Sequence, residues 1–181
     1  MKTKRIVITG GPGTGKTALI EHLTKAGYHT LPEISRAVTK KAQAEGIDQL
    51  FLENPILFSE MLLEGRLRQY HQSVHVDAPY LFYDRGMPDV TSYMNYLGTE
   101  YNDKFREICN SYLYDAVFLL PPWKDIYVRD NERYESFKEA RIIFNYLQKG
   151  YEGFGYDVIE VPVGTLEHRT QFIIKKLDRL F

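Results

Sequence analysis

Near its amino end the chain reads Gly10-Gly11-Pro12-Gly13-Thr14-Gly15-Lys16-Thr17, which fits the pattern G-x-x-x-x-G-K-[ST] at every fixed position. An apolar run from Arg5 to Thr9 precedes this segment, and a helix-like run from Ala18 to Lys25 follows it. In that order, a strand, a glycine loop and a helix bring backbone N–H groups around an anion, to which the helix N-terminus adds partial positive charge. Residues 10–17, the phosphate loop, therefore predict a binding site for nucleotide phosphates. The alternative is a strand-to-helix turn without a ligand.

The composition predicts one globular domain over residues 1–181. Hydrophobic residues make up 44% of the chain and aromatic residues 14%, too many for a disordered segment. Lys and Arg number 23 against 24 Asp and Glu, so we expect neither a nucleic-acid partner nor attachment to a membrane surface. A single cysteine, Cys109, excludes an intramolecular disulfide, and no window holds the roughly 20 apolar residues of a membrane span. We expect a cytoplasmic protein, and the sequence leaves its oligomeric state open.

Short apolar runs rich in β-branched residues alternate with longer segments of helical period. This alternation predicts an α/β fold in which helices cover both faces of a parallel sheet. Capping patterns mark three helix starts, at Asn54 before Pro55, at Ser136 with Glu139 three residues later, and at Thr165. Five strands are predicted, at residues 5–9, 28–31, 80–83, 116–120 and 157–161.

The phosphate loop resembles that of the P-loop NTPases. The resemblance implies a three-layer α/β/α fold that binds ATP through Gly11, Pro12, Gly13, Thr14, Gly15, Lys16, Thr17 and Ala18. It also implies that Lys16 neutralises the β and γ oxygens while the Thr17 hydroxyl joins the Mg²⁺ shell. GTPases typically read guanine with an Asn-Lys-x-Asp segment, and none occurs in this chain, which favours adenine.

Asp84 and Arg85 directly follow the predicted strand at 80–83. AAA+ ATPases usually place a Glu after the magnesium-linked Asp to polarise water, but Arg85 stands at that position. The pair is instead similar to the Asp-Arg motif of thymidylate kinases and the Glu-Arg motif of deoxynucleoside kinases. That similarity implies that Asp84 holds Mg²⁺, directly or through water, and that Arg85 stabilises the transferring phosphate. A strand-end salt bridge or a helix cap is the alternative interpretation.

A second acid lies after the second predicted strand, in the segment Glu33-Ile34-Ser35-Arg36. It resembles the Glu-x-x-Arg that follows the second strand in deoxynucleoside kinases and ribosylnicotinamide kinase domains. The resemblance implies that Glu33 is the general base for an acceptor hydroxyl and that Glu33, Arg36 and Arg85 bind substrate. The spacing of three also suits an ordinary surface ion pair between Glu33 and Arg36.

Two further residues are candidates for binding. Asp89 lies in the first turn of a helix opened by Pro88 and is a candidate contact to substrate, although the helix dipole also explains an acid there. Gly164 follows the last predicted strand, in a loop that lies near the adenine ring in related kinases.

Residues 121–135 read PPWKDIYVRDNERYE, between the fourth strand and the capped helix at Ser136. The segment looks like the short, arginine-bearing lid of small P-loop kinases. That likeness implies that Arg129 and Arg133 bring positive charge to the γ-phosphate and that closure excludes water. The alternative is a solvated loop whose charges neutralise each other, with aromatic residues 123, 127 and 134 stacking on a base or anchoring the loop.

Taken together, the motifs resemble the small P-loop proteins that include the ribosylnicotinamide kinase domain of NadR, often labelled AAA-domain ATPases. The kinase branch implies the strand order 2-3-1-4-5, which places the strand ending near Asp84 beside the strand at 5–9. An intervening strand would favour the AAA+ branch. The resemblance implies a Mg²⁺-dependent kinase with two small-molecule partners, ATP and an acceptor such as a nucleoside or nucleotide. A nucleotide-dependent switch or an ATPase is the alternative.

Overall fold

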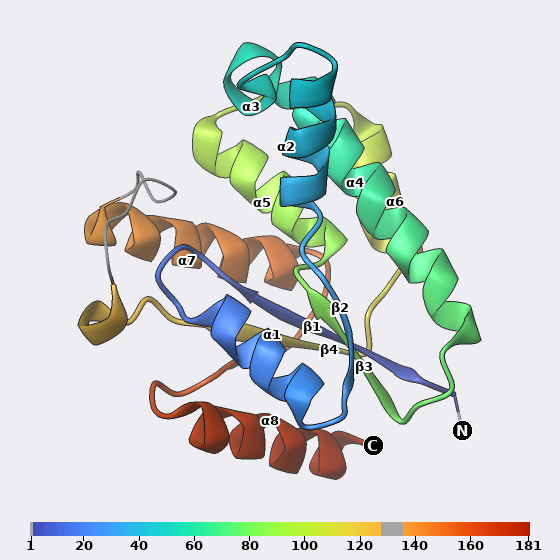
Figure 1. Cartoon of the computed structure of the whole chain (residues 1–181), viewed down its shortest axis with the longest axis vertical. Coiled ribbons are helices and arrows are strands. Elements are labelled where there is room, and N and C mark those ends of the chain that lie inside the picture. Colours follow the sequence, from blue (N-terminus) through green and yellow to red (C-terminus); the bar gives the residue numbers. More distant parts are fainter. Residues whose placement is uncertain (1, 128–135) are drawn as a thin grey trace.

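A parallel sheet forms the centre of the molecule in the computed structural model, which describes residues 2–127 and 136–181 (Figure 1). Within these residues the sheet has five strands in the order β2-β3-β1-β4-β5, so the predicted α/β fold and strand order are confirmed. Each strand lies within two residues of its predicted bounds. The strands are β1 Lys4–Gly10, β2 His29–Leu31, β3 Tyr80–Asp84, β4 Ala116–Leu120 and β5 Val158–Glu160.

The central strand β1 pairs directly with β3 and with β4. Ile8 lies opposite Asp84 in the first ladder, and Gly10 lies opposite Leu120 in the second. No strand intervenes between β1 and β3, which is the order expected of the kinase branch. Because parallel strands end at the same edge of a sheet, the phosphate loop and Asp84 lie at one edge.

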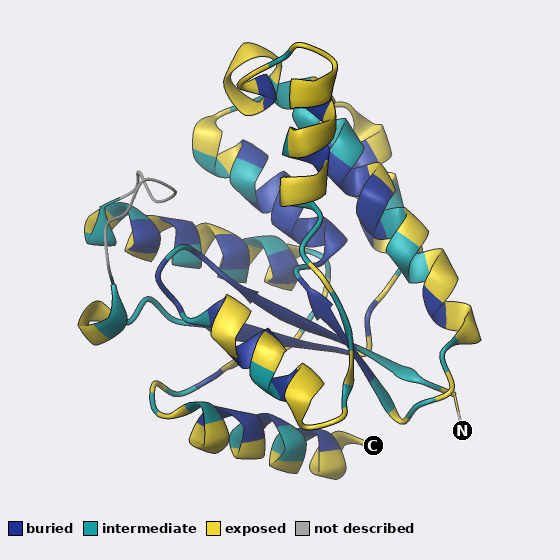
Figure 2. Cartoon of the chain, in the orientation of Figure 1, coloured by how far each residue is buried: buried dark blue, intermediate teal, exposed yellow. Residues whose placement is uncertain are grey.

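Helices cover both faces of the sheet. Ile6 and Ile8 of β1 pack in one buried cluster with α1 and α8, whereas Val7 between them packs in another with α4, α5 and α7. This alternation is the period of two expected of a strand, and the buried strands between the two layers are visible in Figure 2. The helices are α1 Lys16–Lys25, α2 Ser35–Ala44, α3 Leu50–Glu53, α4 Pro55–Gln72, α5 Met87–Leu97, α6 Asp103–Ser111, α7 Phe137–Gly153 and α8 Leu166–Leu180, with 3₁₀ turns at Ser73–His75 and Lys124–Ile126.

The three predicted helix starts are confirmed by their caps. The side-chain oxygens of Asn54, Ser136 and Thr165 each accept a hydrogen bond from the backbone N–H three residues later, at 3.0, 3.2 and 3.2 Å. No helix in the described part of the chain is long and apolar enough to cross a membrane.

The predicted lid is only partly described. Pro121 to Tyr127 leave β4 and include the 3₁₀ turn Lys124–Ile126, whereas Arg129 and Arg133 lie outside the described residues.

Candidate functional site

The phosphate loop joins β1 to α1 in a fixed conformation. Gly13 and Gly15 have φ angles of 70° and 74°, in the left-handed region that favours glycine. The Thr14 hydroxyl donates to the Gly11 carbonyl at 3.0 Å and closes the loop on itself. The Tyr127 ring lies so close to Gly13 that a Cβ at this position would overlap it. Tyr127 therefore anchors the start of the predicted lid on the phosphate loop.

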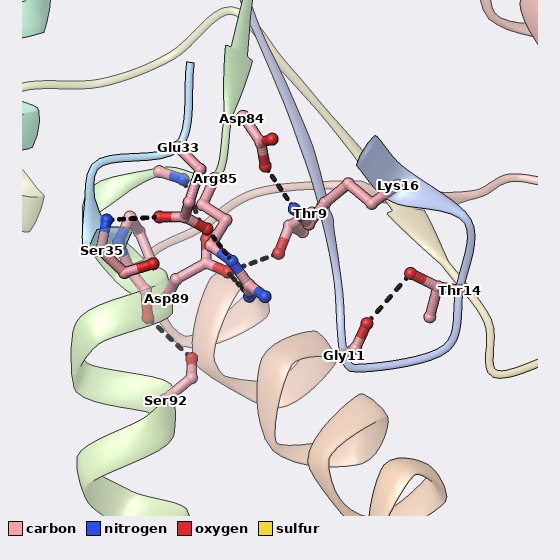
Figure 3. Close-up of polar contacts among 12 residues, drawn as sticks. Thr9, Gly11, Thr14, Lys16, Glu33, Ser35, Asp84, Arg85, Asp89 and Ser92 are labelled. Carbon is pink, nitrogen blue, oxygen red and sulfur yellow. Dashed lines mark hydrogen bonds and ion pairs between the residues drawn. The ribbon is translucent and has the colours of Figure 1, made fainter. Parts of the chain in front are cut away.

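Lys16 forms a buried ion pair with Asp84 across the carboxyl ends of β1 and β3 (Figure 3). The two residues are 8% and 5% exposed. Burial lowers the pKa of Lys16, and the nearby positive charge of Arg85 lowers it further, while Asp84 opposes both effects. The residue predicted for phosphates and the residue predicted for Mg²⁺ thus face each other.

Glu33 lies after β2 and pairs with two arginines from other elements. Its Oε2 accepts from Arg85 Nε at 2.6 Å, and its Oε1 lies 3.5 Å from Arg66 Nη2 in α4. Burial raises the pKa of this carboxyl, but the positive charges of Arg85, Arg66 and Lys16 outweigh burial and lower the pKa to about 2. Glu33 is therefore an anion at neutral pH, clamped beside the Lys16–Asp84 pair.

Asp89 is almost fully buried, at 1% exposure, and four donors point at its carboxylate. Its Oδ1 accepts from Thr9 at 2.6 Å and from Arg85 Nη1 at 3.2 Å. Its Oδ2 accepts from the Gly86 N–H at 2.9 Å and from the Tyr151 hydroxyl. Asp89 thus ties β1, α5 and α7 to the guanidinium of Arg85, an arrangement that positions Arg85 and leaves little of the carboxylate for a ligand.

Arg85 is the one non-glycine residue with a left-handed backbone in the described part of the chain, at a φ of 72°. For an L-residue this conformation costs roughly 1–2 kcal/mol. The side chain compensates through its bonds to Glu33 and Asp89, and Arg66 Nη1 holds the next peptide by donating to the Gly86 carbonyl at 2.8 Å. Such local strain is common where a side chain must be held in one position for function.

The other predicted site residues lie at varying distances from this cluster. Arg36 is exposed in the first turn of α2, whereas Glu33 precedes that helix and meets Arg85 and Arg66. Thr17 and Ala18 are exposed in the first turn of α1, and Gly164 is half-buried in the loop before α8. Pro12 is half-buried, and Gly11 is buried against Ile143 of α7.

Besides Thr9, three residues of the site were not predicted from the sequence. Arg66 and Tyr151 lie on long helices where an arginine or tyrosine gives no signal of its own, and both are buried against the Glu33–Arg85–Asp89 cluster. Arg169 of α8 is 1% exposed and donates from Nη1 to the Thr14 carbonyl of the phosphate loop at 3.0 Å. Only tertiary packing distinguishes these side chains from those of surface residues.

Comparisons with known proteins agree with this architecture. The model of a family described as AAA domain matches residues 5–169. A solved deoxyadenosine kinase from M. mycoides, with products dCMP and a flexible dCDP bound, superposes with a TM-score of 0.66 at 18% identity, covering 97% of this chain and 99% of that one. A NadR protein in complex with NR superposes with a TM-score of 0.74 at 19% identity over 97% of this chain and 51% of that one, so this chain spans about half of that protein. A search of curated proteins found no match.

Proposed function

The chain belongs to the AAA domain family, and we propose that it is a small-molecule kinase that uses Mg²⁺-ATP to phosphorylate a hydroxyl or phosphate acceptor. The observation that carries this proposal is the clamped carboxylate of Glu33 beside the Lys16–Asp84 pair. AAA+ ATPases usually place a Glu that polarises water after the magnesium-linked Asp, and this chain has Arg85 at that position, which favours transfer to a bound acceptor. A nucleoside or nucleotide is the proposed acceptor class, because the structural neighbours include enzymes named or solved with such ligands.

Thr17 and Asp84 are the residues that would hold Mg²⁺. Their hydroxyl and carboxylate oxygens are hard donors, which suit this ion. The described residues contain no cluster of three or more His, Cys, Asp or Glu side chains that could hold a metal. The sparse set still fits Mg²⁺, since Mg²⁺ usually keeps several waters and binds through one or two protein groups and substrate phosphates. When bound, the ion would neutralise charge on the β and γ phosphate oxygens.

Lys16 and Arg85 are the cations proposed to offset charge on the transferring phosphate. Lys16 now faces Asp84, so binding of the triphosphate would exchange this carboxylate for phosphate oxygens. Arg85 is held by Glu33 and Asp89 with its guanidinium fixed in place, which lowers the cost of ordering it during the reaction. We also propose Gly164 as a backbone contact to adenine and Arg129 and Arg133 as lid cations.

Glu33 is proposed to orient the acceptor rather than to remove its proton early. A carboxylate with a pKa of about 2 is a weak base. Phosphoryl transfer passes through a loose transition state that asks for positioning and charge stabilisation more than for deprotonation. An acceptor hydroxyl that donates to Glu33 would be aligned with the γ-phosphate, and Arg36 is the proposed second contact to it.

The test is transfer of radiolabelled γ-phosphate from ATP, with Mg²⁺, to a panel of nucleosides, nucleotides and related alcohols. We expect a labelled acceptor, slow hydrolysis without one, and no transfer by Lys16→Met. The matched control is Lys4→Met, since Lys4 pairs with Asp115 at 3.2 Å on the surface and should be dispensable. Hydrolysis with no labelled product would support an ATPase instead. Tight triphosphate binding without either reaction would support a nucleotide-dependent switch.

A further inference from the structure

Arg169 is a buried cation that the mechanism above does not use. It lies in the first turn of α8 at 1% exposure, and its Nε and Nη2 atoms have no hydrogen-bond partner in the described structure. Burial lowers the pKa of this guanidinium, and no ion pair with a carboxylate of the described residues opposes that shift. Burying a charge without a partner is costly, so a fold that keeps one here indicates a ligand or a function that compensates for it.

Among the described residues, the one side-chain hydrogen bond of Arg169 goes to the backbone of the phosphate loop. Nη1 donates to the Thr14 carbonyl at 3.0 Å, and a Cβ placed on Gly15 would lie 3.0 Å from the same nitrogen. The guanidinium thus packs directly against the Thr14–Gly15 peptide. Gly15 caps α1 in the left-handed conformation, and any side chain at this position would displace either Arg169 or Ile126.

The planarity of the peptide links this contact to the opposite side of the loop. In a trans peptide the C=O and the following N–H point in opposite directions. With the Thr14 carbonyl held by Arg169, the Gly15 N–H points away from Arg169. The hydrogen bond from Arg169 also draws electron density toward the Thr14 carbonyl oxygen. This polarises the Gly15 N–H of the same peptide and makes it a stronger donor.

We propose that Arg169 is a positioning residue of the phosphate loop, which turns the Gly15 N–H toward the bound polyphosphate and whose buried charge the polyphosphate offsets. The proposal rests on the proposed nucleotide binding. It gives α8, which carries none of the motif residues, a role in phosphate affinity. It also explains why a cation is buried beside a loop that binds anions.

The experiment compares Arg169→Met and Arg169→Lys with the wild type in calorimetric titrations against Mg²⁺-ATP, inorganic tripolyphosphate and adenosine. A hydrogen bond from a charged donor contributes about 1.5–3 kcal/mol, equivalent to about 10-fold to 140-fold in affinity. We expect Arg169→Met to lower the affinity for tripolyphosphate and for ATP by that factor and to leave the affinity for adenosine unchanged. Arg169→Lys, which keeps the charge, should recover part of the loss.

The matched control is Thr170→Val. Thr170 neighbours Arg169, is 9% exposed and has a buried hydroxyl without a partner. This variant should bind tripolyphosphate like the wild type. Equal tripolyphosphate affinity in Arg169→Met and the wild type would overturn the proposal, because a purely structural arginine predicts that result.

A second measurement covers the case in which Arg169→Met does not fold. In Arg169→Lys, we expect the Gly15 amide proton to move upfield in the NMR spectrum relative to the wild type, and an unmoved resonance would overturn the proposal. Failure of the proposed kinase function is distinguishable. A wild type that binds tripolyphosphate in an Arg169-dependent way but transfers no phosphate contradicts the kinase proposal alone, whereas a wild type that binds no polyphosphate contradicts both.

Discussion

Glu33 Oε2 and Arg85 Nε lie 2.6 Å apart, although 52 residues separate them in the chain. The contact follows from the sheet, because β2 and β3 are hydrogen-bonded neighbours and both residues come after the carboxyl ends of these strands. A motif after one strand and a motif after another therefore act as one unit. Variants of either residue should be interpreted as changes to the pair.

Glu33→Gln should change how stability depends on pH. The pKa of Glu33 is lowered from 4.5 to about 2, so the ionised carboxylate stabilises the fold fully above about pH 4.5. That contribution is lost as the pH falls toward 2, and the shift corresponds to about 3 kcal/mol. In urea denaturation, the difference in free energy of unfolding between the wild type and Glu33→Gln should therefore shrink by that amount between pH 5 and pH 2. Glu64→Gln, at an exposed position of α4, should follow the wild type throughout. If the stability difference between the wild type and Glu33→Gln did not change with pH, the carboxylate would not be stabilised by the two arginines.

Lys16→Met should destabilise the fold as well as abolish ATP binding. Asp84 would be left as a buried carboxylate without its cation, a change that typically costs about 3–5 kcal/mol. The double variant Lys16→Met with Asp84→Asn should recover most of this loss, since replacing both members of a buried pair is often neutral. Chemical denaturation measures the stabilities and calorimetry the binding, which should stay absent in both variants. A double variant no more stable than the single one would argue against the buried pair.

Arg85→Gly should be more stable than Arg85→Ala, by about 1 kcal/mol. Neither variant can reach Glu33 or Asp89, so both lose the same side-chain bonds. They differ in the backbone, because a φ of 72° is strained for alanine and relaxed for glycine. Thermal unfolding of the two variants measures this difference. If Arg85→Ala were the more stable variant, the backbone at position 85 would have relaxed once the guanidinium was gone. Both variants should lose phosphoryl transfer.

Gly13→Ala should weaken nucleotide binding, because a Cβ there would overlap the Tyr127 ring. Adding Tyr127→Ala should restore only part of the affinity, since a φ of 70° still disfavours alanine at position 13. Gly153→Ala is a suitable control, as a Cβ at that helix position would meet nothing within 4 Å. Calorimetry with Mg²⁺-ATP tests the series. Full restoration by Tyr127→Ala would show that crowding alone, and not backbone conformation, requires the glycine.

The sequence predicts best those features that are contiguous in the chain. The phosphate loop and the three capped helix starts are local patterns, and the structure has each of them where the pattern lies. Helices α2 and α6 were not predicted, since each buries only two residues, four positions apart. Helix α3 has four residues, too few for a helical period to be visible.

Partners across the site were harder to predict. Spacing suggested Arg36 as the partner of Glu33, yet Arg85 and Arg66 hold its carboxylate in the structure. Asp89 is predicted as a candidate contact to substrate, with the helix dipole as the alternative explanation, and only the packing reveals the four donors around it. These contacts depend on which strands become neighbours, information that no local window contains.

Lys16 and Asp84 are 68 residues apart, and this separation bears on biosynthesis. At about 5–20 residues added per second, a ribosome would need roughly 3–14 s to deliver the aspartate after the lysine. Throughout that interval the emerging chain has the lysine but neither its counter-ion nor the strands that flank β1. The anion-binding loop would thus mature late although it is translated early, and truncated chains that stop before β3 are poor candidates for nucleotide capture.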